Sequence, residues 1–201
     1  MNPRALAALF LVAVFALGAA VLAARARNEE PPARERPLRF EGATIPRGLP
    51  APDFSLTNQS GERVTMRGLR GRPVIVTFLY SNCDETCPAQ AQVVKGALDQ
   101  LGKDVPALAI AVDPPRDTEQ SARGFLAKQR MTGRMDFVLG SRRELRPLWR
   151  GYAIRPQEVT REHQGRYVLI DPRGRQRVGF PLDQATPERI AHDIRLLARG
   201  T

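Results

Sequence analysis

The stretch VIVTFLYSNCDETCP, residues 74–88, joins a continuous apolar run to both cysteines of the chain. The run at 74–79 is rich in Val and Ile and is bounded by Gly and Pro, which predicts a central strand buried on both faces. Pro88 stands where a helix can begin, and residues 89–101 are good helix formers followed by Gly102. The stretch therefore predicts a reactive loop at the carboxyl end of a central strand, where sites in α/β sheets usually lie.

Strand-like and helix-like patterns alternate in the chain that surrounds this stretch. Two short strands at 54–56 and 63–65 are expected to form a hairpin, because a turn sequence separates them. Further strands are expected at 107–112, 137–139, 167–170 and 177–180, and further helices at 118–129, capped by Thr118, at 142–149 and at 186–199. Such an alternation of elements predicts an α/β sandwich.

Length and cysteine usage limit the class of protein. A chain of 201 residues with 42% hydrophobic residues can hold one domain with a real core and additional segments. The two cysteines, at 83 and 87, would close only a very small loop, so a disulfide there would add little stability. A chain with no third cysteine to mispair suits an oxidising compartment. Cysteine usage thus favours a domain outside the cytoplasm.

The N-terminal region predicts attachment to a membrane. Residues 5–24 carry no charged side chain, and a spanning helix needs about 20 apolar residues. We expect residues 1–24 to be an uncleaved anchor or, less favoured, a cleaved signal segment, whose apolar part is usually shorter. Residues 25–50 are rich in Pro and Arg and predict a flexible tether, which leaves 51–201 as the folded domain. The expected location is membrane-anchored, with the soluble domain on the extracytoplasmic side.

The two cysteines can act as nucleophiles or as metal ligands. If Pro88 is the first helical residue, Cys87 lies at the helix N-cap, where free amides and the helix dipole favour a thiolate. Two thiolates suit Cu(I) and are acceptable to Zn(II), and a metal normally recruits a further donor. The chain offers His163, in a polar loop before a strand, and His192, inside the expected last helix. We expect His192 to be an ordinary surface histidine.

Three segments together make the chain similar to the Sco (SenC) family of copper-delivery proteins. They are Cys83–Pro88 after one buried strand, Val112–Thr118 after the next, and His163 placed eight residues before Asp171. The resemblance covers about residues 50–200. It implies a thioredoxin-like sandwich with a central mixed sheet on a membrane tether. It also implies one copper ion, as Cu(I) or Cu(II), bound by Cys83, Cys87 and His163.

Two residues depart from the pattern of that family, and three others could support the site. The family commonly has proline where this chain has Asp84, and aspartate where it has Glu162. The first departure affects the rigidity of the loop, and the second affects the orientation or charge balance of the histidine. Asp113, Arg116 and Asp117 form either a supporting cluster of ion pairs near the site or an ordinary turn with a helix cap; the sequence favours neither.

The resemblance implies a metallochaperone that passes copper to the copper-binding subunit of cytochrome c oxidase. The alternative is an enzyme, a membrane-tethered thiol-disulfide reductase that uses the same cysteines on an exported oxidase subunit. A peroxidase is less favoured because the Thr-x-x-Cys arrangement of peroxiredoxins is missing. The formal net charge of +10 can steer the domain toward an acidic partner or anionic lipid. Nucleic acid is not an expected partner, because the basic residues are dispersed and form no recognised binding motif.

Overall fold

The computed structural model describes residues 39–46, 49–102, 105–156 and 165–200. Within them the chain forms a six-stranded sheet in the order β1-β8-β7-β4-β5-β6 and a separate hairpin, β2-β3. The strands of the sheet are β1 (Ala43–Thr44), β8 (Gln176–Pro181), β7 (Arg166–Ile170), β4 (Val74–Leu79), β5 (Ala107–Ala111) and β6 (Asp136–Val138). The three strands β4, β5 and β6 are parallel, whereas β7, β8 and β1 pair antiparallel, so the sheet is mixed.

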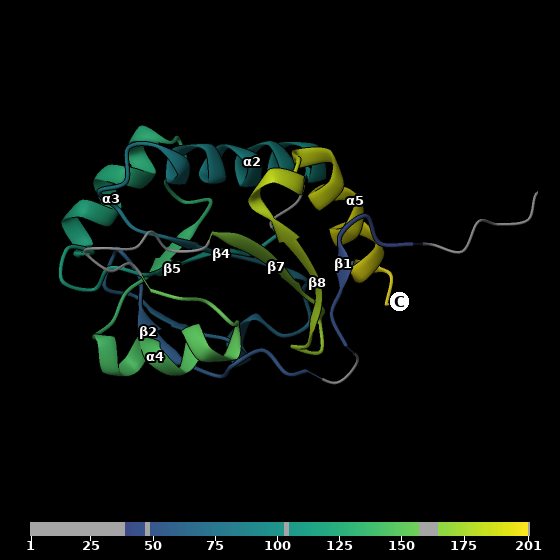
Figure 1. Ribbon diagram of the computed structural model, residues 1–201, viewed down its shortest axis with the longest axis horizontal. Helices are drawn as coiled ribbons and strands as arrows, with labels where there is room; N and C mark the ends of the chain where they lie inside the picture. Colours follow the sequence, from purple (N-terminus) through teal and green to yellow (C-terminus); the bar gives the residue numbers. More distant parts are fainter. Residues whose placement is uncertain (1–38, 47–48, 103–104, 157–164, 201) are drawn as a thin grey trace, which may run out of the picture. The chain divides into compact units, whose positions relative to one another are not determined.

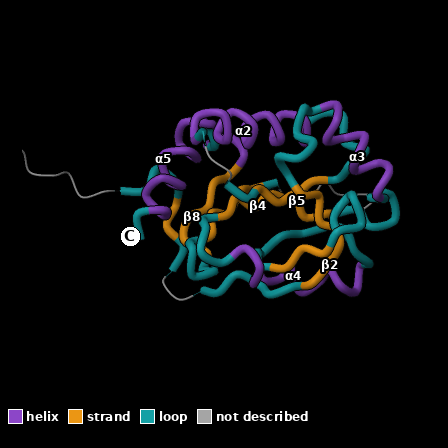
Figure 2. The backbone as a smooth tube through the Cα atoms, turned by 180° about the vertical axis from the view of Figure 1, so that it is seen from behind, coloured by secondary structure: helices purple, strands orange, loops and turns teal. Residues whose placement is uncertain are grey.

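Helices cover the two faces of this sheet (Figures 1 and 2). They are α2 (Thr86–Leu101), α3 (Glu119–Lys128), α4 (Arg142–Gly151) and α5 (Pro187–Ala198). On one face α2 packs beside α5, and the Gln92 side chain of α2 donates to the carbonyl of Gln129 at the end of α3. On the other face lie α4 and the hairpin of β2 (Ser55–Thr57) and β3 (Arg63–Thr65). The mixed α/β sandwich predicted from the sequence is confirmed.

The central strand agrees with the sequence prediction, whereas the helix after it begins at a different residue. All six residues of β4 are buried, as a strand with helices on both sides requires. The helix starts earlier than expected, at Thr86, and its N-cap is Glu85. The prediction that Cys87 is the N-cap is therefore wrong, and Cys87 is the second helical residue. Proline is compatible with any position of the first turn, because the N–H groups there have no partner within the helix.

The segment before the predicted domain is partly folded onto it. The compact unit begins at Phe40, and β1 pairs with β8. The carboxylate of Asp193, which is 0% exposed on α5, accepts hydrogen bonds from the backbone amides of Glu41 (2.8 Å) and Gly42 (3.0 Å). The prediction of a tether over 25–50 is thus wrong for its described residues from Phe40 onward. A two-residue strand has no periodicity to read, and the carboxylate that holds it is about 150 residues away in the sequence.

The predicted membrane anchor at 1–24 lies outside the described residues. In the part of the chain that the structure does describe, no helix combines the length and the apolar character needed to cross a membrane.

Candidate metal centre

The two cysteines lie just beyond the carboxyl end of β4, in the loop and the first turn of α2. Cys83 is 5% exposed and Cys87 is 0% exposed. The backbone amide of Cys87 donates to the Sγ atom of Cys83 over 3.2 Å, and the Thr86 hydroxyl lies 3.7 Å from the same sulfur. Because the amides of a first helical turn have no partner within the helix, they favour negative charge on an atom placed against them. The Cys83 sulfur occupies that position.

The surroundings push the two thiols in opposite directions. Burial alone would raise the pKa of the Cys83 thiol, but hydrogen bonds with the side chain and amide of Cys87 and with Tyr80 and Thr86 together outweigh it and lower the pKa. Burial raises the pKa of the Cys87 thiol, and its hydrogen bond to Cys83 raises that pKa further. Both cysteines are free. Their thiols therefore both titrate, and the pKa of Cys83 is the lower of the two. Cys83 is thus the thiol that ionises first.

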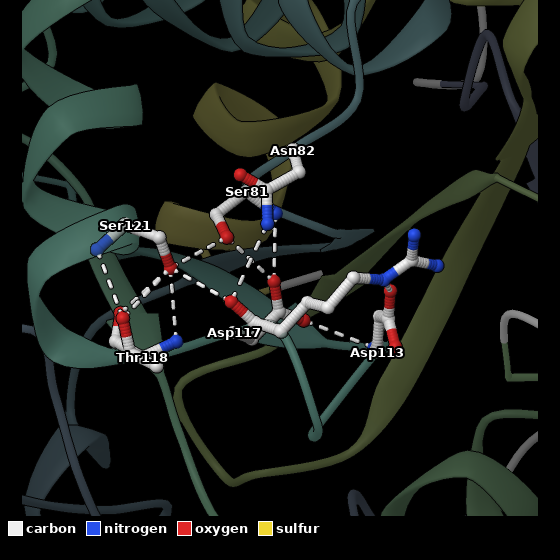
Figure 3. A network of polar contacts seen from close by, with 7 residues as sticks. Ser81, Asn82, Asp113, Asp117, Thr118 and Ser121 are labelled. Carbon is white, nitrogen blue, oxygen red and sulfur yellow. Dashed lines mark hydrogen bonds and ion pairs between the residues drawn. The ribbon is translucent and has the colours of Figure 1, made fainter.

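A polar network fixes the strand-to-cysteine loop to the loop that follows β5 (Figure 3). One carboxylate oxygen of Asp117 accepts from the amide (2.7 Å) and the hydroxyl (2.8 Å) of Ser81. The other oxygen accepts from the amide of Asp113 (2.9 Å). The Arg116 guanidinium pairs with the Asp113 carboxylate, and the Ser81 hydroxyl also contacts Ser121. Of the two readings left open by the sequence, the structure supports a cluster that holds the loop two residues before Cys83.

The start of α3 joins the same network. Thr118 caps the helix through a hydrogen bond from the Ser121 amide, and the Ser121 side chain returns a contact to the Thr118 amide. The prediction of a helix capped by Thr118 is confirmed. The cap fixes α3 directly after Asp117, so the carboxylate that holds the cysteine loop has a rigid base.

Asp117 should make stability depend on pH. Burial raises the pKa of this carboxyl from 3.8 to about 6 in the folded protein. The folded state therefore holds a proton that the unfolded state has lost, and stability contributed by Asp117 decreases as pH rises through about 6. The shift corresponds to at most about 3 kcal/mol. Asp117→Asn cannot titrate. As pH rises through about 6, we therefore expect the free energy of unfolding of the wild type, relative to that of Asp117→Asn, to fall by up to that amount.

Urea unfolding of both proteins between about pH 4 and about pH 8 measures this difference. Asparagine keeps an oxygen for Ser81 but presents an NH₂ group to the amide of Asp113, so the variant should also be less stable at the acid end. A difference that stays constant with pH would show that Asp117 does not titrate in this range.

A second buried polar cluster lies behind Cys87, and the sequence did not reveal it. Thr77 of β4 donates to the side-chain oxygen of Gln90 on α2 (3.1 Å), and the Tyr167 hydroxyl of β7 donates to the Gln90 carbonyl (3.2 Å). Burial and the nearby Cys87 raise the pKa of Tyr167. The only signal in the sequence was Thr77, the one polar residue of an otherwise apolar strand. The cluster ties β4, α2 and β7 together next to Cys87.

The structure describes only part of the predicted ligand set. His163 and Glu162 lie outside the described residues, whereas His192 lies on α5, where its Nδ1 atom is 2.9 Å from the Asp193 carboxylate. Within the described ranges, no group of three His, Cys, Asp or Glu side chains could hold a metal ion. The strand after the predicted histidine, β7, pairs antiparallel with β4, with Tyr167 opposite Thr77. The first residues of β7 thus lie toward the edge of the sheet that carries the cysteines.

Comparison with known proteins gives one consistent answer. A sequence model of the SCO1/SenC family matches residues 43–199. Protein SenC of Rhodobacter capsulatus is 30% identical over 156 residues, which cover 70% of this chain and 67% of that protein. The chain spans only 39% of the mitochondrial SCO1 homolog 1 of Arabidopsis thaliana and 54% of the mitochondrial SCO1 homolog of Homo sapiens.

Two solved structures show the same fold. The copper-bound structure of ScoI from Bradyrhizobium japonicum is 29% identical, with a TM-score of 0.63, and the match covers 73% of this chain and 98% of that one. BsSco, described as a member of the Sco family of cytochrome c oxidase assembly proteins with a disulfide switch, is 20% identical with a TM-score of 0.68. That match covers 79% of this chain and 99% of BsSco.

Proposed function

The chain belongs to the SCO1/SenC family, and on that premise we propose that it binds one copper ion and delivers it to the copper centre of cytochrome c oxidase. The observation that carries the proposal is the pair of buried, free thiols at the start of α2, one of which receives a helix amide. The copper-bound structure of the Bradyrhizobium japonicum relative supports copper as the metal. Two soft thiolates suit Cu(I).

His163 is the proposed third ligand. Imidazole is a donor that suits Cu(II), so a histidine beside two thiolates would let one site hold copper in either oxidation state. The position of β7 supports this choice, because the strand starts three residues after His163 and its first residues lie toward the cysteine edge. His192 is a poor alternative, since its ring is engaged with Asp193.

The donor set fits a protein that releases its metal. Cys83 and Cys87 are adjacent in the fold but come from a loop and a first helical turn, and Cys83 retains 5% exposure while Cys87 has none. Cys83 is therefore the thiol that an incoming donor of the receiving subunit can replace first, while Cys87 retains its hold. We propose that this exchange takes place on the extracytoplasmic side, with residues 1–24 as the membrane anchor.

The second candidate is a thiol-disulfide reductase. The unequal pKa values of the two thiols favour it, because an acidic, more exposed thiol beside a buried, weakly acidic one is the usual division between an attacking and a resolving cysteine. The same two residues would then reduce a disulfide in an exported oxidase subunit. A reductase consumes reducing equivalents, whereas a delivery protein consumes copper. Supplying one or the other to cells therefore tests the two functions directly.

Deletion of the gene should lower cytochrome c oxidase activity in cells of the source organism. We expect added copper to restore most of that activity and added thiol reductant to restore little, because delivery of a metal can be replaced by mass action. Oxidase activity in membranes from each culture is the measurement. Rescue by reductant with no effect of copper would favour the reductase instead.

A further inference from the structure

One end of the unit that begins at Phe40 combines an exposed leucine with arginines. Among the described residues Leu49 is the one large hydrophobic side chain classed as exposed, at 44%. Its carbonyl accepts from the amide of Gln176, directly after the turn between β7 and β8. That turn is held by the buried Asp171, which accepts from the amides of Arg173 and Arg175. Leu49 is therefore fixed beside the turn.

Four exposed arginines lie on the segments that meet at this turn, and we name the group, together with Leu49, the basic tip. They are Arg70, Arg150, Arg173 and Arg175. Contacts between their segments place them together. Any side chain on Gly174 would come within 3.4 Å of the Arg70 Nε atom, and the Gln176 side chain donates to the carbonyl of Gly151, next to Arg150.

The positive charge of the basic tip is not neutralised by its surroundings. Within the described residues none of its four guanidinium groups forms an ion pair. The carboxylate that holds the turn, Asp171, is already paired with Arg177 (3.2 Å). Four uncompensated charges around one apolar side chain form a surface that attracts anions and can also bury a small apolar group.

We propose that the basic tip docks on the anionic surface of a lipid bilayer, with the arginines on lipid phosphates and Leu49 in the interface. One guanidinium group can bind two phosphate oxygens at once. Each basic residue near an anionic membrane also strengthens the attraction between the protein and the membrane. A protein partner fits less well, because the central anchors of protein interfaces are usually aromatic or clustered apolar residues, and the basic tip offers a single leucine. This proposal does not depend on copper binding.

The position of the basic tip gives docking a consequence for the metal centre. Val74, the first residue of β4, pairs with Ile170 next to the turn, whereas the cysteines follow the last residue of β4. The basic tip and the cysteine loop thus lie at opposite ends of the central strand. A domain docked through the basic tip would present its cysteines away from the bilayer. If residues 1–24 are the anchor, the 15 residues before Phe40 can reach at most about 50 Å.

The test is amide hydrogen exchange of the full chain in lipid nanodiscs. We expect the amides of residues 49, 51, 171 and 173–176 to exchange more slowly in discs that contain phosphatidylglycerol than in discs of phosphatidylcholine alone. In Arg173→Gln/Arg175→Gln the docking constant read from this protection should fall about 25-fold, because each basic residue contributes about fivefold. Leu49→Ser should weaken docking without changing charge.

The matched control is Lys128→Gln/Arg130→Gln, which removes the same charge at the end of α3, far from the turn (Figures 1 and 2). It should keep the protection of the basic tip. Equal protection in neutral and anionic discs, or equal loss in both double variants, would overturn the proposal. Protection that appears only when an acidic oxidase subunit is added, and not with anionic lipid, would assign the surface to a protein partner instead.

Discussion

The reduced protein is expected to bind one Cu(I), and the same protein with a Cys83–Cys87 disulfide to bind essentially none. A disulfide sulfur is no longer a thiolate, so oxidation removes both soft donors at once. Both thiols are free, and the side chains of Cys83 and Cys87 contact each other. Titration of both forms with Cu(I) against a competing chelator gives the stoichiometry and the affinity.

Single substitutions test each of the two sulfur donors in turn. Cys83→Ser or Cys87→Ser should weaken Cu(I) binding by more than the roughly 10–100-fold typical for loss of a group that only orients a ligand. Asn82→Ala, which changes an exposed neighbour of Cys83, is the control and should bind as the wild type does. Equal binding by the reduced and oxidised proteins would contradict a dithiolate site.

His163→Ala should abolish or greatly weaken stable Cu(II) binding while Cu(I) binding survives with reduced affinity. Imidazole suits Cu(II), whereas two thiolates can hold Cu(I) alone. The thiolate-to-Cu(II) charge-transfer absorption follows the oxidised metal directly. The matched variant is His192→Ala, the only other histidine of the chain, and it should change neither titration.

The opposite pattern would be informative. If His192→Ala removes the absorption band and His163→Ala keeps it, the assignment of the third ligand is wrong. His192→Ala must then be checked for folding, because its ring contacts Asp193, which holds the segment before β1. Unchanged urea unfolding of that variant would exclude loss of structure as the cause.

The sequence predicted the elements that carry their own local signal. The strand at 74–79 is an unbroken apolar run, and burial on both faces requires such a run, so its limits were predicted to the residue. The helix at Thr118 was predicted from its cap, which the structure confirms. The start of α2 was missed by two residues, because Pro88 is compatible with several positions of a first turn.

Contacts between distant residues could not be predicted. Asp193 accepts hydrogen bonds from the amides of Glu41 and Gly42, about 150 residues earlier in the sequence. The local sequence of neither segment indicates that the two are in contact. Asp117 was recognised as a candidate, but its bond to Ser81 requires β4 and β5 to lie side by side. Both cases depend on the pairing of strands, which a local pattern does not specify.

The most direct test of the copper centre is X-ray absorption of the protein loaded with one copper ion. We predict two sulfur ligands in both oxidation states, with an imidazole nitrogen that disappears in His163→Ala. Cys87→Ser should lose one sulfur and keep the nitrogen. A spectrum with no sulfur ligand, or one that Cys83→Ser and Cys87→Ser leave unchanged, would rule out a copper site built on the two cysteines.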